Sequence, residues 1–267
     1  MANLAWNPPR YLLAPHPAEA IATAVSGAAL VVLVLWSCRD WIRGGDRLGP
    51  FVIIGGSIAA FQEPIVDSLG HIFLRTNMPA FTTLGRSIPF WGVLAYGGFY
   101  GTGTYLIYRF ARRGADRRTL RTVVAAIVLA NLVLEPVLIA VHLYTYYGRQ
   151  PLRLIEFPVF WPFINVPGQV LGAMVLIKQP QWFSGWRVAL GLLLVPVAVV
   201  AGSLASGLPV FSVLNASGRP SGALLSLAAL ITIVFGVLVM EGAVRALAPS
   251  VRVAGTDVGA GLRVDVA

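Results

Sequence analysis

Phe61-Gln-Glu-Pro-Ile-Val-Asp-Ser-Leu-Gly-His71 places ionisable side chains inside an apolar stretch that is long enough to cross a bilayer. Glu63, Asp67 and His71 are spaced four residues apart, so a continuous helix would carry them on one face. Charged groups at membrane depth are costly, and they usually face a cavity or a partner. The stretch therefore predicts a polar site within a membrane-spanning helix.

Pro64 adds a second signal beside Glu63. Proline lacks an amide hydrogen and clashes with the preceding turn, so we expect the carbonyl of Ala60 to lose its partner. The helix should bend here and direct the Glu63 carboxyl group toward the cavity or partner that such a residue needs.

The same pattern returns about 71 residues later. Leu134-Glu-Pro-Val-Leu-Ile-Ala-Val-His142 again has Glu before Pro and His downstream. Ser87-Ile-Pro-Phe-Trp91 has a counterpart in Glu156-Phe-Pro-Val-Phe-Trp161. These correspondences predict a diverged internal repeat that relates residues 51–110 to residues 120–178.

Composition predicts a polytopic membrane protein. Of the 267 residues, 57% are hydrophobic and only 12% are charged, and the mean hydropathy is +0.77. The net charge of +9 comes almost entirely from arginines dispersed between apolar segments. We therefore expect membrane lipid, and no nucleic acid, as the partner of the basic residues. The single cysteine, Cys38, excludes an internal disulfide framework and a cysteine-based zinc site.

We expect an all-α fold, a seven-transmembrane-helix bundle over residues 1–246, followed by a disordered cytoplasmic tail over residues 247–267. Each apolar segment is close to the ~20 residues that a spanning helix needs. Gly97 and Gly101 predict close helix packing in the third segment. The seven segments are Ala18–Cys38, Phe51–Phe73, Ile88–Tyr108, Leu120–Tyr144, Phe157–Ile177, Val188–Leu208 and Leu224–Met240.

The distribution of basic residues predicts the orientation in the cell (inner or plasma) membrane. Fourteen of the 20 basic residues lie on one side of the expected bundle and six on the other. Because the excess favours the cytoplasm, the N-terminus should lie outside and the C-terminus inside. The polar and aromatic residues of four helices then meet in one layer, which predicts a cavity in the outer half of the membrane.

This polar layer favours acid–base chemistry. A carboxyl group in an apolar cavity is readily held in its neutral form, so Glu63 is the predicted proton donor, with Asp67 beside it. His71 or His142 would stabilise the carboxylate that remains after the proton leaves, and Glu135 would supply a further carboxyl group. These five residues are the expected catalytic residues.

Aromatic and amide side chains are expected to line the same cavity. Ring faces stabilise cations, and a small number of polar groups can orient a substrate. The expected substrate-binding residues are Phe61, Trp91, Tyr96, Tyr100, Asn131, Trp161 and Asn165.

Several reaction classes lack their residues in this chain. A retinal protein needs a lysine in its last helix, but the only lysine is Lys178, in an expected loop. No Asp-Asp-x-x-Asp pattern is present to hold magnesium on a diphosphate, and the Gly-x-Ser-x-Gly and His-Glu-x-x-His motifs are absent from the sequence. We expect a metal-independent reaction without a cofactor, in which a carboxylic acid protonates an alkene or epoxide of a lipophilic polyene and ring closure follows.

The seven expected spans, the Glu63-Pro64 kink followed by Asp67, and the aromatic helices resemble the bacterial AveC-like membrane proteins, mainly over Phe51–Gln169. That family includes a spirocyclase of polyketide biosynthesis and membrane-bound, drimentine-type terpene cyclases. The resemblance implies a protonation-initiated cyclisation of a farnesyl chain on an indole, another aromatic or a cyclodipeptide, after an upstream prenyltransferase. The fungal membrane-bound meroterpenoid cyclases are similar in span count and paired acids. They place one acid in the last helix, where this chain has nothing deeper than Glu241, so the identity of the second carboxyl stays open.

Other functions also stay open. Parallel repeats, kinked helices and midplane carboxyl groups are typical of small proton-coupled transporters too. Against transport, the polar residues have no matching path through the last two expected spans. A polyketide spirocyclase or dehydratase would use the same acid–base residues on a different substrate, and a purely structural membrane subunit would use none of them.

Overall fold

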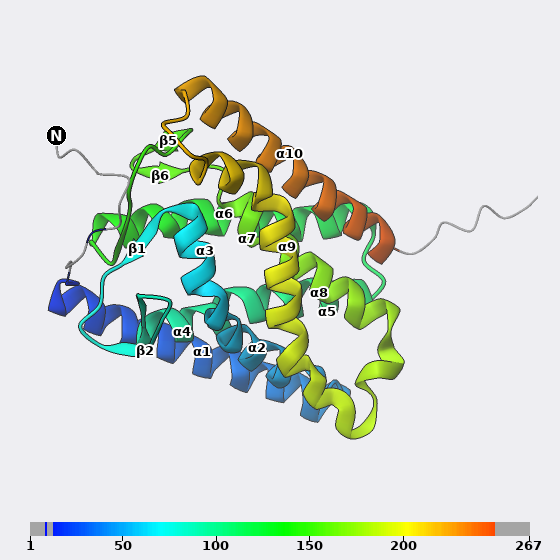
Figure 1. The fold of residues 1–267 in the computed structure, drawn as a ribbon. Helices are drawn as coiled ribbons and strands as arrows, with labels where there is room; N and C mark the ends of the chain where they lie inside the picture. The colour runs from blue at the N-terminus through cyan, green and yellow to red at the C-terminus, as the bar shows by residue number, and fades with distance from the viewer. Residues whose placement is uncertain (1–8, 10–12, 249–267) are drawn as a thin grey trace, which may run out of the picture.

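A computed structural model describes Pro9 and residues 13–248 of the chain. The fold is mostly helical, and short β-ribbons gather at one end of the helices (Figure 1). The C-terminal end of α10 lies at the opposite end of the molecule (Figure 1). The all-α prediction is confirmed, with the ribbons as connections. The expected disordered tail, residues 247–267, lies beyond the described part of the chain except for its first two residues.

The secondary structure alternates helices with short connecting strands. The α-helices of the described residues are α1 (His16–Gly44), α2 (Leu48–Ile58), α3 (Glu63–Gly70), α4 (Phe90–Tyr96), α5 (Thr102–Arg112), α6 (Arg117–Ala140), α7 (Pro162–Asn165), α8 (Pro167–Lys178), α9 (Gly191–Leu214) and α10 (Gly222–Leu247). The segments η1 (Ala59–Gln62), η3 (Pro180–Phe183) and η4 (Gly185–Leu190) are 3₁₀-helical, and η2 (Gly97–Gly101) is a π-helical turn. The strands β1 (Ile72–Leu74), β2 (Pro79–Thr83), β3 (Arg86–Pro89), β4 (Tyr144–Tyr146), β5 (Arg153–Leu154) and β6 (Phe157–Pro158) form the antiparallel pairs β1–β4, β2–β3 and β5–β6.

Five helical stretches among the described residues are long and apolar enough to cross a membrane. They are His16–Gly44, Leu48–Gly70, Arg117–Ala140, Gly185–Leu214 and Gly222–Leu247. α7 and α8 together form a shorter apolar helix, Pro162–Lys178, and the π-helical turn η2 interrupts the stretch from α4 to α5. The structure thus agrees with a membrane protein, in which five of the seven expected spans meet the criteria of length and composition.

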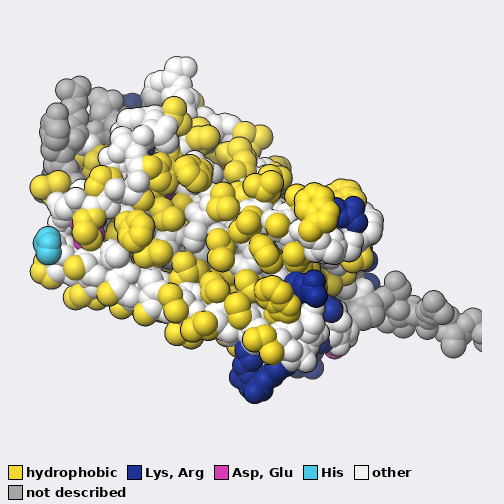
Figure 2. Space-filling model, turned by 90° about the horizontal axis from the view of Figure 1, so that it is seen from below, with side chains coloured by type: hydrophobic (Ala, Val, Ile, Leu, Met, Phe, Trp, Pro, Cys, Tyr) yellow, Lys and Arg dark blue, Asp and Glu magenta, His cyan; other side chains and the backbone are white. Residues whose placement is uncertain are grey.

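Apolar side chains cover the outside of the bundle. Val32, Leu35 and Val197 are each more than 60% exposed. Figure 2 shows one face of the molecule, which is mainly hydrophobic, with Lys and Arg side chains gathered at one end. Such a surface suits a bundle surrounded by lipid, with its basic end in the headgroup region.

The helical stretch that carries Glu63, Leu48–Gly70, ends earlier than predicted. It ends where His71 adopts a left-handed conformation (φ 57°) and the His71 amide donates to the carbonyl of Asp67. α6 likewise ends two residues before His142, which has φ 60°. The expected spans Phe51–Phe73 and Leu120–Tyr144 place both histidines inside helices. This prediction is wrong, because each histidine lies in a turn that leads into a strand.

The turn before Glu63 narrows into the 3₁₀ segment η1. The amide of Glu63 donates to the carbonyl of Ala60, so that carbonyl keeps a partner although Pro64 cannot supply one. The expected loss of this hydrogen bond is wrong, because a change of helix type accommodates the proline instead. Pro136, by contrast, lies inside α6, which continues through it.

Two segments with the same order of elements meet at the β1–β4 ribbon. In each, a helix ends near a left-handed histidine, a strand and a hairpin follow, and another helix begins. Phe73 pairs with Thr145, and Leu74 pairs with Tyr144. Because 71 residues separate Phe73 from Tyr144 and Leu74 from Thr145, a shift by this distance converts one pair into the other. The register is locally two-fold symmetric, as a repeat would require, and the common descent of residues 51–110 and 120–178 stays a prediction.

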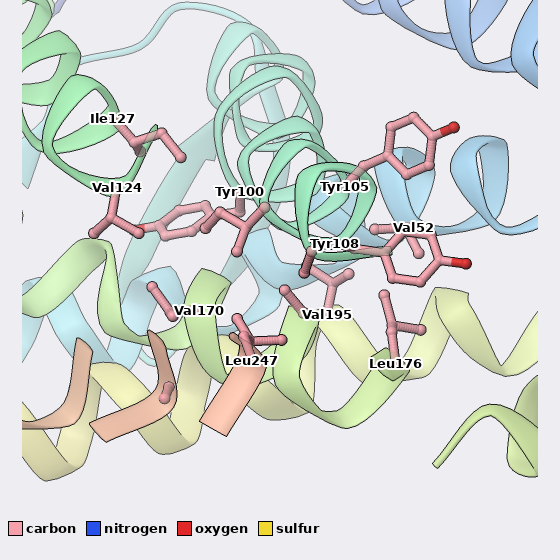
Figure 3. Close-up of a cluster of buried hydrophobic side chains, with 14 of the residues drawn as sticks. Val52, Tyr100, Tyr105, Tyr108, Val124, Ile127, Val170, Leu176, Val195 and Leu247 are labelled. Atoms are coloured by element: carbon pink, nitrogen blue, oxygen red, sulfur yellow. The ribbon is translucent and has the colours of Figure 1, made fainter. Parts of the chain in front are cut away.

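A buried apolar cluster packs between the helices of the bundle (Figure 3). It draws side chains from α2, α5, α6, α8, α9 and α10, and Val52, Tyr105 and Leu120 within it are fully buried. The cluster extends from Tyr100 of η2 to Leu247 in the last turn of α10. The bundle is therefore closely packed toward the end where α10 terminates.

Glycines let α2 approach the π-helical turn η2. A β-carbon on Gly56 would lie 2.8 Å from the carbonyl oxygen of Tyr96 and 2.8 Å from the α-carbon of Gly101. A β-carbon on Gly97 would lie 2.7 Å from a methyl group of Leu30 in α1. The predicted close packing around Gly97 and Gly101 is confirmed.

Gly56→Ala should destabilise the fold, because the atoms that its methyl group would meet belong to the backbone and cannot rotate away. Overpacking of this kind costs ~1–3 kcal/mol, which should lower the melting temperature of the purified protein by several degrees. Gly27→Ala on α1 is the matched control, since the nearest atom to its β-carbon would be a Leu94 methyl group at 3.6 Å. Equal melting temperatures for the two variants would contradict the close approach.

Candidate active site

A cavity of about 740 Å³ lies among α1, α3, the α4–α5 segment, α6, β4 and α7. Its wall is mostly apolar and carries a small number of converging polar groups, which is typical of a small-molecule site. Eight of the residues predicted for the site line this cavity. They are Glu63, Trp91, Tyr96, Tyr100, Asn131, Glu135, Trp161 and Asn165.

The cavity reaches the apolar flank of the bundle. Val25 of α1 and Leu134 of α6 both line it, and they are 62% and 54% exposed. Other lining residues of the same two helices, such as Ala29 and Val123, are also apolar. A lipophilic molecule could therefore reach the cavity between α1 and α6 without crossing a polar surface.

Glu63 and Asp67 form a pair of carboxyl groups one turn apart on α3. Their side chains interact with each other. Glu63 reaches the cavity, whereas Asp67 is 1% exposed and lies outside its lining. A substrate in the cavity could therefore touch Glu63, whereas Asp67 could act on it only through Glu63.

Arg86 of β3 provides a positive charge beside Asp67. It is buried, and its guanidinium interacts electrostatically with the Asp67 carboxyl group. The same guanidinium donates to the carbonyl of Ile72 at 3.1 Å and to the hydroxyl of Tyr147 at 2.6 Å. These hydrogen bonds fix Arg86, so a negative charge on the carboxyl pair has a stationary positive partner.

Glu135 is held by hydrogen bonds on both carboxyl oxygens. Asn131 Nδ2 donates to Oε1 at 3.0 Å, and the hydroxyl of Tyr144 donates to Oε2. Asn165 Nδ2 donates to the amide oxygen of Asn131 at 3.2 Å, and Tyr100 donates to the amide oxygen of Asn165 at 3.0 Å. The five side chains, from η2, α6, β4 and α7, form one chain of hydrogen bonds along the cavity wall.

Tyr100 is presented by the π-helical turn η2. A π turn contains one more residue than an α turn, so it shifts the side chains that follow it around the helix axis. Gly97 and Gly101 bound this turn and allow it to pack against α2. π turns are frequent at functional sites, and here the turn supplies one end of the hydrogen-bond chain.

Aromatic rings form much of the rest of the wall. Trp91 and Trp161 are both buried and line the cavity. The ring of Tyr146 lies 5.9 Å from that of Trp161, and the rings of Tyr96 and Tyr100 lie 4.7 Å apart. Ring faces in an apolar cavity attract positive charge, so the wall suits a ligand or intermediate that carries a cation.

Besides Asp67, three predicted site residues lie away from the cavity wall. Phe61 is 66% exposed and stacks on Phe81 at 4.8 Å. His71 is buried and stacks on Tyr147 at 4.9 Å. His142 lines a separate cavity of about 320 Å³. The left-handed turns at the two histidines explain why helical spacing misplaced them.

Tyr144, Tyr146 and Arg86 belong to the site although sequence reasoning did not include them. Tyr144-Thr-Tyr146 alternates with a period of two, which is a strand signal, but it stands at the end of an apolar run whose length predicts a helix. Arg86 counts as an outer-loop arginine in the sequence, and only the fold shows that it is buried beside a carboxyl group.

The site combines carboxyl, amide, phenol and indole groups, which suit acid–base chemistry on a lipophilic molecule. Within Pro9 and residues 13–248, no group of three or more His, Cys, Asp or Glu side chains is arranged to hold one metal ion. Comparison of the chain with models of protein families, with curated proteins and with solved structures finds no match.

Proposed function

We propose that this protein is a membrane-bound cyclase that protonates the prenyl chain of a lipophilic substrate and thereby closes it into rings. The observation that carries the proposal is that two carboxyl groups with different neighbours line one apolar cavity. Glu63 adjoins a second carboxyl group, Asp67, whereas Glu135 accepts hydrogen bonds on both oxygens. Carboxyl groups in unlike environments are the arrangement by which enzymes separate an acid from a base.

Glu63 is the proposed acid. Two neighbouring carboxyl groups in apolar surroundings do not readily ionise together, so the pair retains a proton. Glu63 is the member of the pair that lines the cavity. When its proton leaves, Arg86 beside Asp67 offsets the added negative charge.

Glu135 is the proposed base. An ionised carboxylate is acceptor-only, and Glu135 accepts from Tyr144 and Asn131. These donors stabilise its negative charge and orient it toward the cavity that it shares with Glu63. The second carboxyl that the sequence leaves open is therefore assigned to α6 rather than to the last helix.

The proposed reaction moves one proton in and one proton out. The Glu63 proton adds to a terminal alkene, forming a C–H bond and a carbocation, or opens a terminal epoxide. Each following alkene donates its π electrons to the cation, so a C–C bond forms and the charge advances past the rings of Trp91, Tyr96 and Trp161. Glu135 removes the last proton and an alkene is restored, so the product is an isomer of the substrate.

The cavity supports a prenylated substrate. Its volume of about 740 Å³ lies within the range of small-molecule sites, and its wall is mostly apolar. We propose a farnesyl chain on an indole, another aromatic or a cyclodipeptide, attached by an upstream prenyltransferase, as the resemblance to the AveC-like membrane proteins implies. Asn131 and Asn165 offer amide groups to the polar end of such a molecule.

We propose seven crossings of the cell membrane. The stretch α4–η2–α5 covers residues 90–112, which at ~1.5 Å per residue suffices for a ~30 Å hydrocarbon core. α7–α8 would supply the remaining crossing, completed by the ribbon that precedes it. The basic end would face the cytoplasm, with the N-terminus outside. The expected restriction of the cavity to the outer half is wrong, because its lining extends from Trp91 at the ribbon end to Phe110 and Val123 near the basic end.

A reporter fused after Ala267 should be active only as a cytoplasmic reporter, because the basic residues concentrate at the end where α10 terminates. Alkaline phosphatase and a fluorescent protein, fused in turn, measure the two compartments. Activity of the alkaline phosphatase fusion would show the reverse orientation, in which the ribbon end of the bundle faces the cytoplasm.

A proton-coupled transporter is the main alternative, and a polyketide spirocyclase or dehydratase would keep the same residues with another substrate. The apolar cluster of Figure 3 favours an enzyme over a carrier. The cluster packs α2, α5, α8, α9 and α10 closely together, although the cavity beside it reaches Phe110 and Val123 near the basic end. A carrier that opened alternately to the two sides would have to move these packed helices in every cycle.

The test is to incubate the purified full chain with a farnesylated indole and to follow the products by mass spectrometry and NMR. The expected product has the mass of the substrate and fewer alkenes. Proteoliposomes that hold the same protein give the opposing measurement. Uptake of the substrate that depends on a pH gradient, without any isomer, would replace the cyclase with a carrier.

A further inference from the structure

A second cavity, of about 580 Å³, lies at the end of α1 and α5. We call it the arginine pocket, because its lining includes Arg39, Arg43, Arg109, Arg112 and Arg113. These residues come from two helices and the turn after α5. They face a common hollow, whereas basic residues that only orient helices would be scattered over the surface.

Helical spacing builds the pocket. On α1, Trp36, Arg39 and Arg43 follow intervals of three and four residues and share one face. On α5, Tyr105 and Arg109 line the arginine pocket, whereas Leu106 and Phe110 of the same helix line the large cavity. The arginine pocket is therefore a separate site, on a different face of α5.

Two aspartates fix part of the pocket wall. Asp40 pairs with Arg109 at 2.6 Å, and Asp46 pairs with Arg112 at 2.7 Å. Arg109 also lies over the ring of Trp36, with its guanidinium carbon 5.1 Å from the ring centre. These contacts hold two of the guanidinium groups in place before any ligand binds.

The other three arginines of the pocket keep an uncompensated charge. Arg39, Arg43 and Arg113 form no ion pair within the part of the chain that the structure describes. With two aspartates against five arginines, the pocket carries a net charge of about three positive units. Guanidinium groups match the oxygens of phosphate and bind them through paired hydrogen bonds.

We propose that the arginine pocket binds the phosphate group of a ligand at the basic end of the bundle. The pocket includes Trp36 in its lining and lies at the basic end of an apolar bundle, which puts it at the depth of lipid headgroups. The phosphate can come from an anionic phospholipid of the leaflet or from a soluble diphosphate. The proposal does not depend on the cyclase reaction, because the two cavities share no lining residue.

The test uses the purified full chain in neutral detergent, with a fluorescent phosphatidylglycerol as the probe and phosphatidylcholine as its comparison. Phosphatidylglycerol should bind more tightly, since its phosphate charge is not neutralised within the headgroup. The double variant Arg39→Gln/Arg43→Gln should weaken its binding by at least ~10-fold. Neither arginine has a carboxylate partner in the described structure, so the fold and its melting temperature should be unchanged.

The matched control is Arg117→Gln/Arg118→Gln, which removes the same charge from exposed residues of α6 outside the pocket. Inorganic pyrophosphate, added as a competitor, identifies the source. Displacement of the fluorescent lipid by pyrophosphate assigns the pocket to a soluble diphosphate, and retention of the lipid assigns it to the leaflet. Equal weakening by both double variants, or equal binding of the two lipids without any effect of pyrophosphate, would overturn the proposal.

Discussion

Glu63→Gln is expected to lower the turnover of a farnesylated substrate by at least ~10²-fold, the lower end of general-acid effects. The amide keeps the shape of the side chain and removes the proton that starts the reaction. Glu63 is the member of the α3 carboxyl pair that lines the cavity, so Asp67 cannot take its place without moving. In D₂O the wild type should incorporate one deuterium per product, and the variant should form the labelled product more slowly by the same factor.

Glu156→Gln is the matched control for this prediction. It makes the same chemical change on the β5–β6 ribbon, where the side chain is 71% exposed and pairs with Arg153. Its turnover should equal that of the wild type. Asp67→Asn should be milder than Glu63→Gln, because Asp67 acts on the substrate only through its neighbour. Melting temperatures are compared throughout, and near-normal turnover of a folded Glu63→Gln protein would remove Glu63 from the acid role.

The positions of charged residues within the apolar segments of the sequence were enough to predict which residues line the cavity. Glu63 and Glu135 lie 72 residues apart, in different helices, yet both line it. Ionisable residues inside apolar runs are few, and burying them is costly unless they meet in a shared polar space. The sequence could therefore predict which helices face each other around the site.

The histidines show where this reasoning fails. Their spacing from Glu63 and Glu135 is helical, but both adopt left-handed turns with φ near 60°. A non-glycine residue rarely takes this conformation, and the apolar residues that follow His71 and His142 give no turn signal of their own. The helix ends are set by the antiparallel β1–β4 ribbon, a contact between distant segments that local sequence cannot show.

The same ribbon explains why the partner of Glu135 was missed. Tyr144 lies on β4 and pairs with Leu74 across the ribbon, which turns its hydroxyl toward Glu135. A three-residue strand is too short for its period to stand out against an apolar run. The π-helical turn that presents Tyr100 has no sequence signature beyond its glycines, and glycines alone predict close packing.

Glu135→Gln should leave the first proton transfer intact and disrupt the last one. The variant should still incorporate deuterium from D₂O, because Glu63 and Asp67 are unchanged. Without a base, the final cation persists until another group or water quenches it, so the product should shift to altered alkenes and to an alcohol heavier by one water. The proportion of the normal isomer should fall by ~10²-fold, the scale of general-base effects. Mass spectrometry of the product mixture measures both changes.

Tyr144→Phe tests the role of the hydrogen bonds to Glu135 separately from the role of the carboxylate itself. The variant removes the donor to Oε2 of Glu135 but leaves Asn131 on Oε1, so the base remains with less support. Its effect on the product mixture should have the same direction as that of Glu135→Gln and be smaller, since the carboxylate itself and its hydrogen bond from Asn131 remain. A Glu135→Gln protein that makes only the normal isomer would show that the final proton goes elsewhere. If the Glu135→Gln variant no longer forms deuterated product, while the Glu63→Gln variant still does, Glu135 is the acid and Glu63 is the base. The hydrogen bonds from Tyr144 and Asn131 would then hold the proton donor.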